Sequence, residues 1–210
     1  MLSGYCDILV SDYGFRKVTK NIYKGVISEV LKGKELYSFH IQVDLNPILK
    51  NMLPTVTETE NLIPNNIDNH KYTYNNSFCF GVGLHERIIF NKMIKNFKWF
   101  MEKQVKGFLS AYILKDLTGV WGGEEFSHNE LKARKESLQK LLGVYNFTLA
   151  GLNLVEQNII YKIGKCYCGS GKEYIGCHFE KLSSLRRMVS LQDILYELYR
   201  IRELIKNENS

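Results

Sequence analysis

The 210-residue chain lacks several features that would place it in a common class of proteins. No apolar run approaches the roughly 20 residues that a membrane-spanning helix needs. The first residues, MLSGYCDILVSDYG, have neither the basic start nor the long apolar stretch of a secretory signal. Lysine and arginine are spread along the chain without a long run of like charge, and no basic–aromatic recognition motif occurs. These absences favour a cytoplasmic protein that binds neither membranes nor nucleic acids.

The composition that remains is typical of a folded protein. Hydrophobic residues make up 45% of the chain and aromatic residues 12%, which is enough to bury a sizeable core. The length suits one medium domain with an appendage. The net charge of +6 is explained most simply by a solvated, lysine-rich surface.

Alternating apolar residues predict three strands in the first third of the chain. From Tyr37 to Leu45 the odd positions are apolar, which is the pattern of a half-buried strand. Residues 21–31 and 55–59 predict strands before and after it, with Gly33 in the link between the first two. Six asparagines between positions 61 and 76 predict an irregular but ordered loop, because asparagine tolerates left-handed backbone.

Beyond Cys79 the apolar period becomes that of helices. A stripe from Phe90 to Ile113, spaced at three and four residues, predicts one long helix. The pair Ser127 and Glu130 predicts a capping box for a helix through Leu142, and Ser190 with Asp193 predicts a second box for a last helix. Strands followed by helices predict an α+β fold. We expect an antiparallel strand meander with helices over residues 1–145, and a helical tail over residues 146–210.

Three of the five cysteines lie within one short segment, 166–178, which has the sequence CYCGSGKEYIGCH. In a reducing compartment such clustering favours a metal over disulfides. Zinc takes four thiolate or imidazole ligands at the corners of a tetrahedron, and the glycines allow the tight return that brings both ends together. The sequence therefore predicts a structural Zn²⁺ bound by Cys166, Cys168, Cys177 and His178.

The same segment closely resembles the SEC-C motif, a short metal-binding tail found on the bacterial secretion ATPase and on many unrelated bacterial proteins. The C-x-C-G-S-G-K run and the final Cys-His pair carry the match. The resemblance implies an appendage that docks a partner or stabilises the chain. Because protein ligands would fill all four coordination positions, zinc catalysis is not expected. Any reaction must be sought elsewhere in the chain.

Cys79 lies between the predicted strands and the predicted long helix. Taken alone, a single cysteine is usually a small buried apolar residue. The order of strands, histidine, polar turn, cysteine and helix nevertheless resembles the ubiquitin-conjugating enzyme fold, over roughly residues 20–145. His70 precedes Cys79 by nine positions, and residues 119–128, GVWGGEEFSH, resemble a downstream signature of bacterial members. Those members often occur in antiphage operons beside cyclic-nucleotide synthases related to cGAS.

The resemblance implies that Cys79 carries a protein C-terminus as a thioester and yields it to lysine. A thiolate is both a strong nucleophile and a good leaving group. Lysine attack then needs mainly positioning and stabilisation of the developing oxyanion. Besides Cys79, the candidate catalytic residues are His70, which we expect to brace the loop, and Asn76.

The chain departs from the family's usual His-Pro-Asn motif. Lys71 and Tyr72 stand where the proline and the asparagine are expected, so the usual oxyanion-side amide is missing. Asn75 or Asn76 could reach that position, or could support the loop instead.

Four further polar residues could line the same site. His85 and Glu86, just beyond the cysteine, could meet an acceptor or lie in a solvated turn. Glu125 and His128 would approach if the loop after the long helix folds back.

Three functional hypotheses follow from these patterns. The leading one is a ubiquitin-conjugating-like transferase of antiphage defence, whose cargo is the C-terminus of a partner cGAS-like nucleotidyltransferase. The chain has no Gly-rich phosphate loop, so another protein must activate the carboxylate. The alternative is a non-catalytic adaptor that docks a partner through its zinc tail while Cys79 merely packs. The third, nucleic-acid binding through the basic tail, predicts steeply salt-dependent binding to any duplex. A homodimer is compatible with any of them.

Overall fold

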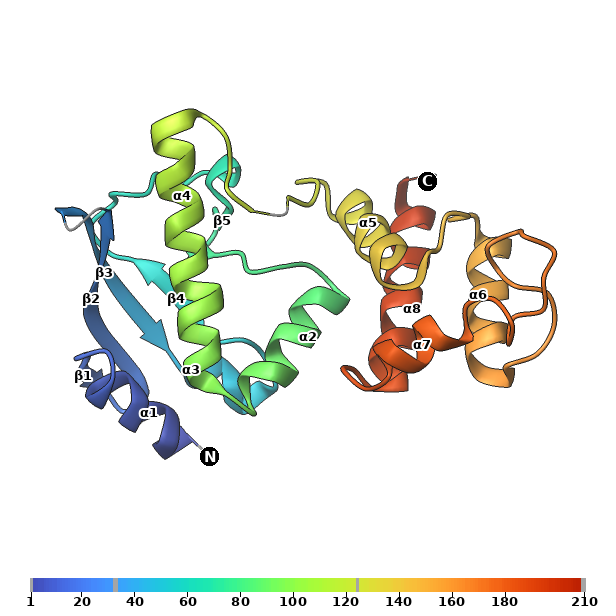
Figure 1. Ribbon diagram of the computed structural model, residues 1–210, viewed down its shortest axis with the longest axis horizontal. Helices are drawn as coiled ribbons and strands as arrows, with labels where there is room; N and C mark the ends of the chain where they lie inside the picture. The colour runs from blue at the N-terminus through green and yellow to red at the C-terminus, as the bar shows by residue number, and fades with distance from the viewer. Residues whose placement is uncertain (1, 32–33, 124, 209–210) are drawn as a thin grey trace. The chain divides into compact units, whose positions relative to one another are not determined.

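The computed structural model describes residues 2–31, 34–123 and 125–208, and its chain divides into two compact units (Figure 1). The first comprises Met1–Phe80 and Lys92–Glu125, and the second comprises Gly81–Asn91 and Phe126–Ser210. The sequence analysis placed the boundary between the two domains after residue 145, whereas the last change from the first compact unit to the second lies between Glu125 and Phe126. The predicted turn at Gly33 lies outside the described residues. None of the described helices combines the length and the apolar character needed to cross a bilayer.

An antiparallel sheet in the order β1-β2-β3-β4-β6-β5 forms the first unit. The three predicted strands are confirmed as β2 (Ile22–Leu31), β3 (Lys34–Asp44) and β4 (Thr55–Glu58). Their register pairs Ile27 with Phe39 and Val43 with Val56. All four side chains are buried, so the apolar positions share the face that the alternation predicted. Three short strands had no such signal: β1 (Arg16–Thr19), β5 (Lys71–Tyr72) and β6 (Ser77–Phe78).

Helices cover the buried face of this sheet. The ring of Phe108 in α4 (Lys106–Thr118) stacks on Phe78 of β6, with centroids 4.0 Å apart. Tyr112 meets Phe39 of β3 edge-on at 6.3 Å. Figure 1 shows α4 running along the sheet. The N-terminal helix α1 (Leu2–Ser11), which the sequence analysis did not predict, buries Tyr5 and Leu9. Two short 3₁₀ helices, η1 (Asn46–Lys50) and η2 (Ile67–Asn69), lie in the loops.

The prediction of a single helix from residue 90 to 113 is wrong. The chain forms α2 (Leu84–Met93), α3 (Phe97–Trp99), a π-helical stretch η3 (Phe100–Val105) and α4. The break lies at Asn96, whose φ is −152° and whose side chain accepts a hydrogen bond from the Trp99 amide at 2.9 Å. An asparagine that binds nearby backbone favours a helix start over a helix interior. The apolar stripe continues across the break, so periodicity could not reveal it.

The second unit contains four further helices: α5 (Glu130–Leu142), α6 (Leu149–Tyr161), α7 (Phe179–Leu185) and α8 (Leu191–Glu208). Helix α5 packs against α7 and α8, and α6 packs against α8 (Figure 1). Their shared core includes Leu138, Leu142, Leu152, Ile194 and Leu198, all with no exposed side-chain surface.

Only one of the two predicted capping boxes is confirmed. Ser190 Oγ accepts a hydrogen bond from the Asp193 amide at 3.1 Å, and the Asp193 carboxylate accepts one from the Ser190 amide at 3.0 Å. At α5 the cap is Asn129, whose Oδ1 accepts from the Lys132 amide at 2.9 Å. The predicted box at Ser127 is therefore wrong, because asparagine two positions later is an equally good cap.

The α+β class is thus confirmed, with an antiparallel sheet and helices in the first unit and a helical second unit.

Candidate functional site

Cys166, Cys168, Cys177 and His178 form a cluster in the second unit. One ligand atom from each residue lies within 4.8 Å of all the others. His178 Nδ1 is 3.1 Å from Cys177 Sγ and 3.3 Å from Cys166 Sγ, and the Cys168 and Cys177 sulfurs are 3.6 Å apart. These four residues could bind a metal ion.

A tight turn brings the two ends of the cluster together. Gly169 and Gly171 have φ of 75° and 73°, left-handed conformations that glycine adopts without steric cost. The Cys166 amide donates to Lys172 O at 2.9 Å, which closes the turn. On the other side, the Cys177 and His178 amides both donate to Tyr174 O. The glycines, the Cys166–Cys168 pair and the Cys177–His178 pair thus lie as the sequence predicted.

Two buried groups anchor the cluster to the helices. Asn158 of α6 is 1% exposed. Its Nδ2 donates to Ile163 O at 2.8 Å, and its Oδ1 accepts from the Tyr167 amide at 2.9 Å. The Tyr167 hydroxyl donates to Leu142 O at the end of α5. The role of Asn158 was not predicted, because its only signal in the sequence is an amide in an otherwise apolar helical face.

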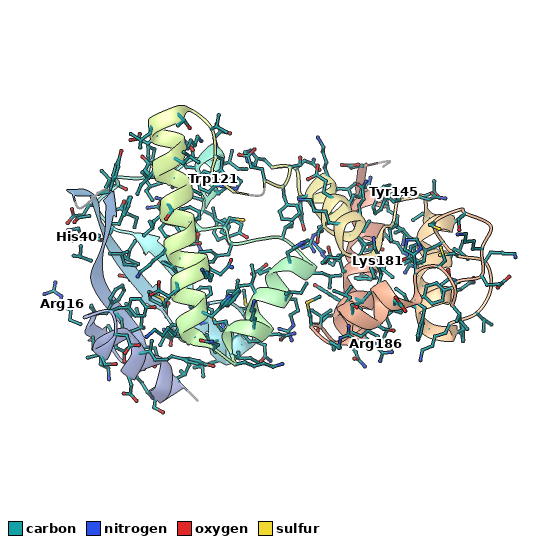
Figure 2. The ribbon with its side chains drawn as sticks, viewed as in Figure 1. Arg16, His40, Trp121, Tyr145, Lys181 and Arg186 are labelled. Atoms are coloured by element: carbon teal, nitrogen blue, oxygen red, sulfur yellow. The ribbon has the colours of Figure 1, made fainter. Side chains whose placement is uncertain are left out.

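The environment shifts the pKa values of Cys166 and Cys168 in opposite directions. Burial, followed by the neighbouring Cys168 and Cys177 thiols, raises the pKa of Cys166 to about 12. Burial also acts on Cys168, but hydrogen bonds with Ser170 and the other two cysteines outweigh it and lower its pKa to about 7. Burial and then the charge of Lys181, labelled in Figure 2, lower the pKa of His178. The imidazole therefore favours the neutral form in which histidine binds metals.

Cys79 ends a short hairpin in the first unit. Strands β5 and β6 pair Lys71 with Phe78 and Tyr72 with Ser77. The Cys79 amide extends this pairing by donating to His70 O at 2.7 Å. The half-buried thiol of Cys79 donates to the Tyr72 hydroxyl, with Sγ and Oη 3.4 Å apart. The contact with Tyr72 was not predicted, because no periodic pattern over residues 71–78 indicates a hairpin.

His70 contacts the segment that follows α4. Its ring lies 4.3 Å from the ring of Trp121, centroid to centroid, and its Nε2 is 3.4 Å from Glu125 Oε1. Trp121, labelled in Figure 2, also meets Phe108 of the core edge-on at 5.3 Å. The segment after α4 thus folds back onto the histidine, as the sequence analysis allowed. Glu124, in the same stretch, lies outside the described residues.

The remaining residues of the hairpin mostly support its turn. Asn75 Oδ1 accepts from both the amide and the hydroxyl of Ser77, at 3.1 and 2.7 Å. Asn76 has a left-handed φ of 59°, and its buried Oδ1 has no hydrogen-bond partner among the described residues. Lys71 is 2% exposed, and its Nζ donates to Ile63 O at 2.8 Å. Burial lowers the pKa of Lys71, an effect that nearby Glu58 opposes.

His85 and Glu86 belong to the first turn of α2, in the second unit. His85 Nδ1 lies 2.8 Å from Ser137 Oγ of α5. Burial raises the pKa of Glu86, and the charge of Arg134 partly offsets this. The alternative of a solvated turn is therefore wrong, because both side chains are half-buried in a helix. His128 is exposed.

Comparison with protein-family models, with curated proteins and with solved structures finds no match to this chain.

Proposed function

We propose that Cys166, Cys168, Cys177 and His178 hold one structural Zn²⁺. A tetrahedral zinc ion with usual bond lengths separates two sulfurs by about 3.8 Å and a sulfur from a nitrogen by about 3.5 Å. The separations of 3.6 Å between sulfurs and 3.1–3.3 Å between sulfur and nitrogen come close to these values. When bound, the ion would join the two arms of the turn and supply folding energy that so small a segment cannot obtain from a core.

Metal analysis of the purified protein tests this assignment. We expect about one zinc per chain, released slowly to a chelator because four protein ligands leave no open position. Iron or no metal in protein purified under reducing conditions would overturn the choice of zinc.

We further propose that the protein is a ubiquitin-conjugating-like acyl carrier. The observation that carries this proposal is the position of Cys79. It is half-buried at the end of the β5–β6 hairpin, hydrogen-bonded through its backbone to His70, with a hydroxyl group against its sulfur. A strand meander precedes it in the chain and helices follow it, which supports the resemblance described above. By that resemblance, the cargo is the C-terminus of a cGAS-like nucleotidyltransferase in antiphage defence.

The chemistry requires two acyl transfers. First, the Cys79 thiolate attacks a carboxyl group that another protein has activated as an adenylate or thioester, and that leaving group departs. Second, a lysine amine attacks the new thioester. The C–S bond breaks, an amide forms, and the amine's proton passes to solvent or to the departing thiolate. In this scheme His70 braces the loop, and Asn76, in the turn of the same hairpin, is a candidate to stabilise the oxyanion.

Co-expression with operon neighbours tests the carrier. The wild-type protein should form an adduct with a partner C-terminus that disappears on addition of thiol. Cys79→Ala should form none, while Cys79→Ser should trap an adduct that resists thiol but yields to hydroxylamine. Cys6→Ala is the matched control, because Cys6 lies in α1 and outside the site. Full conjugation by Cys79→Ala would end the proposal.

A non-catalytic adaptor is the second candidate. The observation that favours it is the buried Lys71, which ties the loop to Ile63 at the place where conjugating enzymes have the proline of their motif. Iodoacetamide distinguishes the two candidates, since a carrier needs an accessible, reactive thiol at Cys79 and an adaptor does not.

A further inference from the structure

The β5–β6 hairpin places a phenol beside the candidate nucleophile. Side chains alternate between the two faces of a strand. Lys71 and Phe78 are paired across the hairpin, and both point into the core, where they are 2% and 3% exposed. Tyr72 and Cys79 therefore share the opposite face, where the Tyr72 hydroxyl and Cys79 Sγ lie 3.4 Å apart.

Resting on the proposed thioester chemistry, we propose that Tyr72 is a catalytic residue that donates a hydrogen bond to the oxyanion formed at the acyl carbon on Cys79. It would thus supply the function of the amide that this chain lacks after His70.

Acylation changes the hydrogen bond that Tyr72 can make. In the free protein the thiol proton is directed at the phenol oxygen. A thioester has no such proton, so the phenol oxygen loses that donor once the acyl group is attached. The acyl oxygen is then only two bonds from Sγ. A phenol keeps its own proton at neutral pH and can donate it. Rotation about the Tyr72 C–O bond is enough to direct that O–H at the acyl oxygen.

The oxyanion is where such a donor has the greatest effect. When the lysine amine attacks, the carbonyl electron pair moves to the acyl oxygen. It returns when the C–S bond breaks and the thiolate leaves. A hydrogen bond that strengthens as this charge develops lowers the barrier, whereas one made equally to the ground state does not. Tyr72 keeps its proton throughout, so the step balances without a further reactant.

Other polar groups of the hairpin are less well placed. Asn75 Oδ1 is committed to Ser77. Asn76 remains a rival, because its side chain lies in the same turn. The backbone of Tyr72 is held by that turn, since its carbonyl accepts from the Asn76 amide at 2.8 Å. The backbone from which the phenol projects is therefore fixed by the turn.

A small-molecule assay tests Tyr72 without the activating enzyme. The probe is a short glycine-ended peptide thioester of mercaptoethanesulfonate, which exchanges onto a free thiolate, and the acceptor is free lysine. For Tyr72→Phe we expect the aminolysis of the Cys79 thioester to slow by about 100-fold, the scale for one oxyanion donor. Tyr74→Phe makes the same chemical change on an exposed ring of the same hairpin and should leave the rate unchanged.

Alkylation by iodoacetamide separates catalysis from positioning. That reaction uses the same thiolate but forms no oxyanion. Loss of the hydroxyl beside Cys79 Sγ shifts the pH profile of alkylation, so the two proteins are compared at a pH where the thiol is ionised in both, and there the alkylation rate should be the same in Tyr72→Phe and wild type. If alkylation and aminolysis fall together, Tyr72 acts on the thiol and the inference is overturned. Equal aminolysis in Tyr72→Phe and wild type also overturns it, and a loss in Asn76→Ala instead would assign the donor to Asn76. If the wild type forms no adduct, or Cys79→Ala still forms one, the carrier proposal itself fails.

Discussion

The two cysteine environments of this chain differ in what surrounds the sulfur. In the second unit, one ligand atom from each of three cysteines and one histidine lies within 4.8 Å of the others. In the first unit, the Cys79 sulfur lies 3.4 Å from the Tyr72 hydroxyl oxygen, and the Cys79 amide donates a hydrogen bond to His70 O. Crowded thiols repel one another once ionised, so a cation is needed to hold them together. A thiol beside a neutral hydroxyl stays available for reaction.

The two units also differ in how they are stabilised. The first has a continuous sheet covered by aromatic side chains from α4. The second has a helical core, but the segment 162–178 contributes mainly exposed residues and turns. Metal binding should therefore matter greatly to the second unit and little to the first.

Replacement of a ligand should give the largest effect. Cys168→Ser should abolish stoichiometric zinc binding. Because structural zinc sites supply about 10 kcal/mol or more of apparent folding energy in small domains, we expect rapid amide exchange after Ile163. Exchange in β2, β3 and β4 should be unchanged. Hydrogen exchange with mass spectrometry measures both regions in one experiment.

Cys6→Ser is the control for that experiment, since Cys6 lies in α1. A Cys168→Ser protein that keeps one zinc per chain and a protected tail would show that this residue is not a ligand.

Local sequence patterns predicted the cluster well and the Cys79 site poorly. The cluster is confined to thirteen residues, so spacing and two glycines are enough to define it. The surroundings of Cys79 come from β5, β6 and the segment after α4. Contacts of Tyr72 and Trp121 depend on strand pairing and on chain return, neither of which leaves a periodic signal. The π-helical stretch and the break at Asn96 were hidden for the opposite reason, because a periodic apolar stripe runs through both.

The largest effect outside the ligands is expected at Asn158. Asn158→Ala removes the hydrogen bond to Ile163 O, on an exposed residue, and leaves the buried Tyr167 amide without its partner. An unpaired buried group costs about 1–3 kcal/mol. We expect a loss of about 2–4 kcal/mol in the unfolding free energy of the second unit and a faster release of zinc to chelator. Asn153→Ala, an exposed site on the same helix, should change neither quantity. Equal effects at both positions would mean that helix propensity, rather than the anchor, is responsible.

A smaller effect is expected at His70. Removing its ring contact with Trp121 and its interaction with Glu125 should cost about 1 kcal/mol in the first unit, and should loosen the hairpin as judged by exchange at Cys79. If His70 only braces the loop, His70→Ala lowers the acyl-transfer rate without moving the pH–rate profile. A shifted profile in a fully folded variant would make His70 an acid–base catalyst. His40→Ala, at an exposed histidine of β3, is the control.

The smallest effect is expected from the carboxyl group of Glu86, which makes the stability of the second unit depend on pH. Burial raises the folded-state pKa of Glu86 above its ordinary value of 4.5. Protonated Glu86 therefore favours folding, and this contribution is complete below pH 4.5 and is lost as pH rises through the raised pKa.

Glu86→Gln has no such titration, so its unfolding free energy should rise relative to wild type as pH increases above 4.5. Urea midpoints of both proteins, measured at several pH values with zinc in excess, give this difference directly. Acid effects on the metal site are common to both proteins and cancel. Glu208→Gln, exposed at the end of α8, makes the same chemical change away from the core and is the control. If the difference between Glu86→Gln and wild type does not change with pH, the carboxylate is not desolvated, and α2 is held in the second unit by its apolar residues alone.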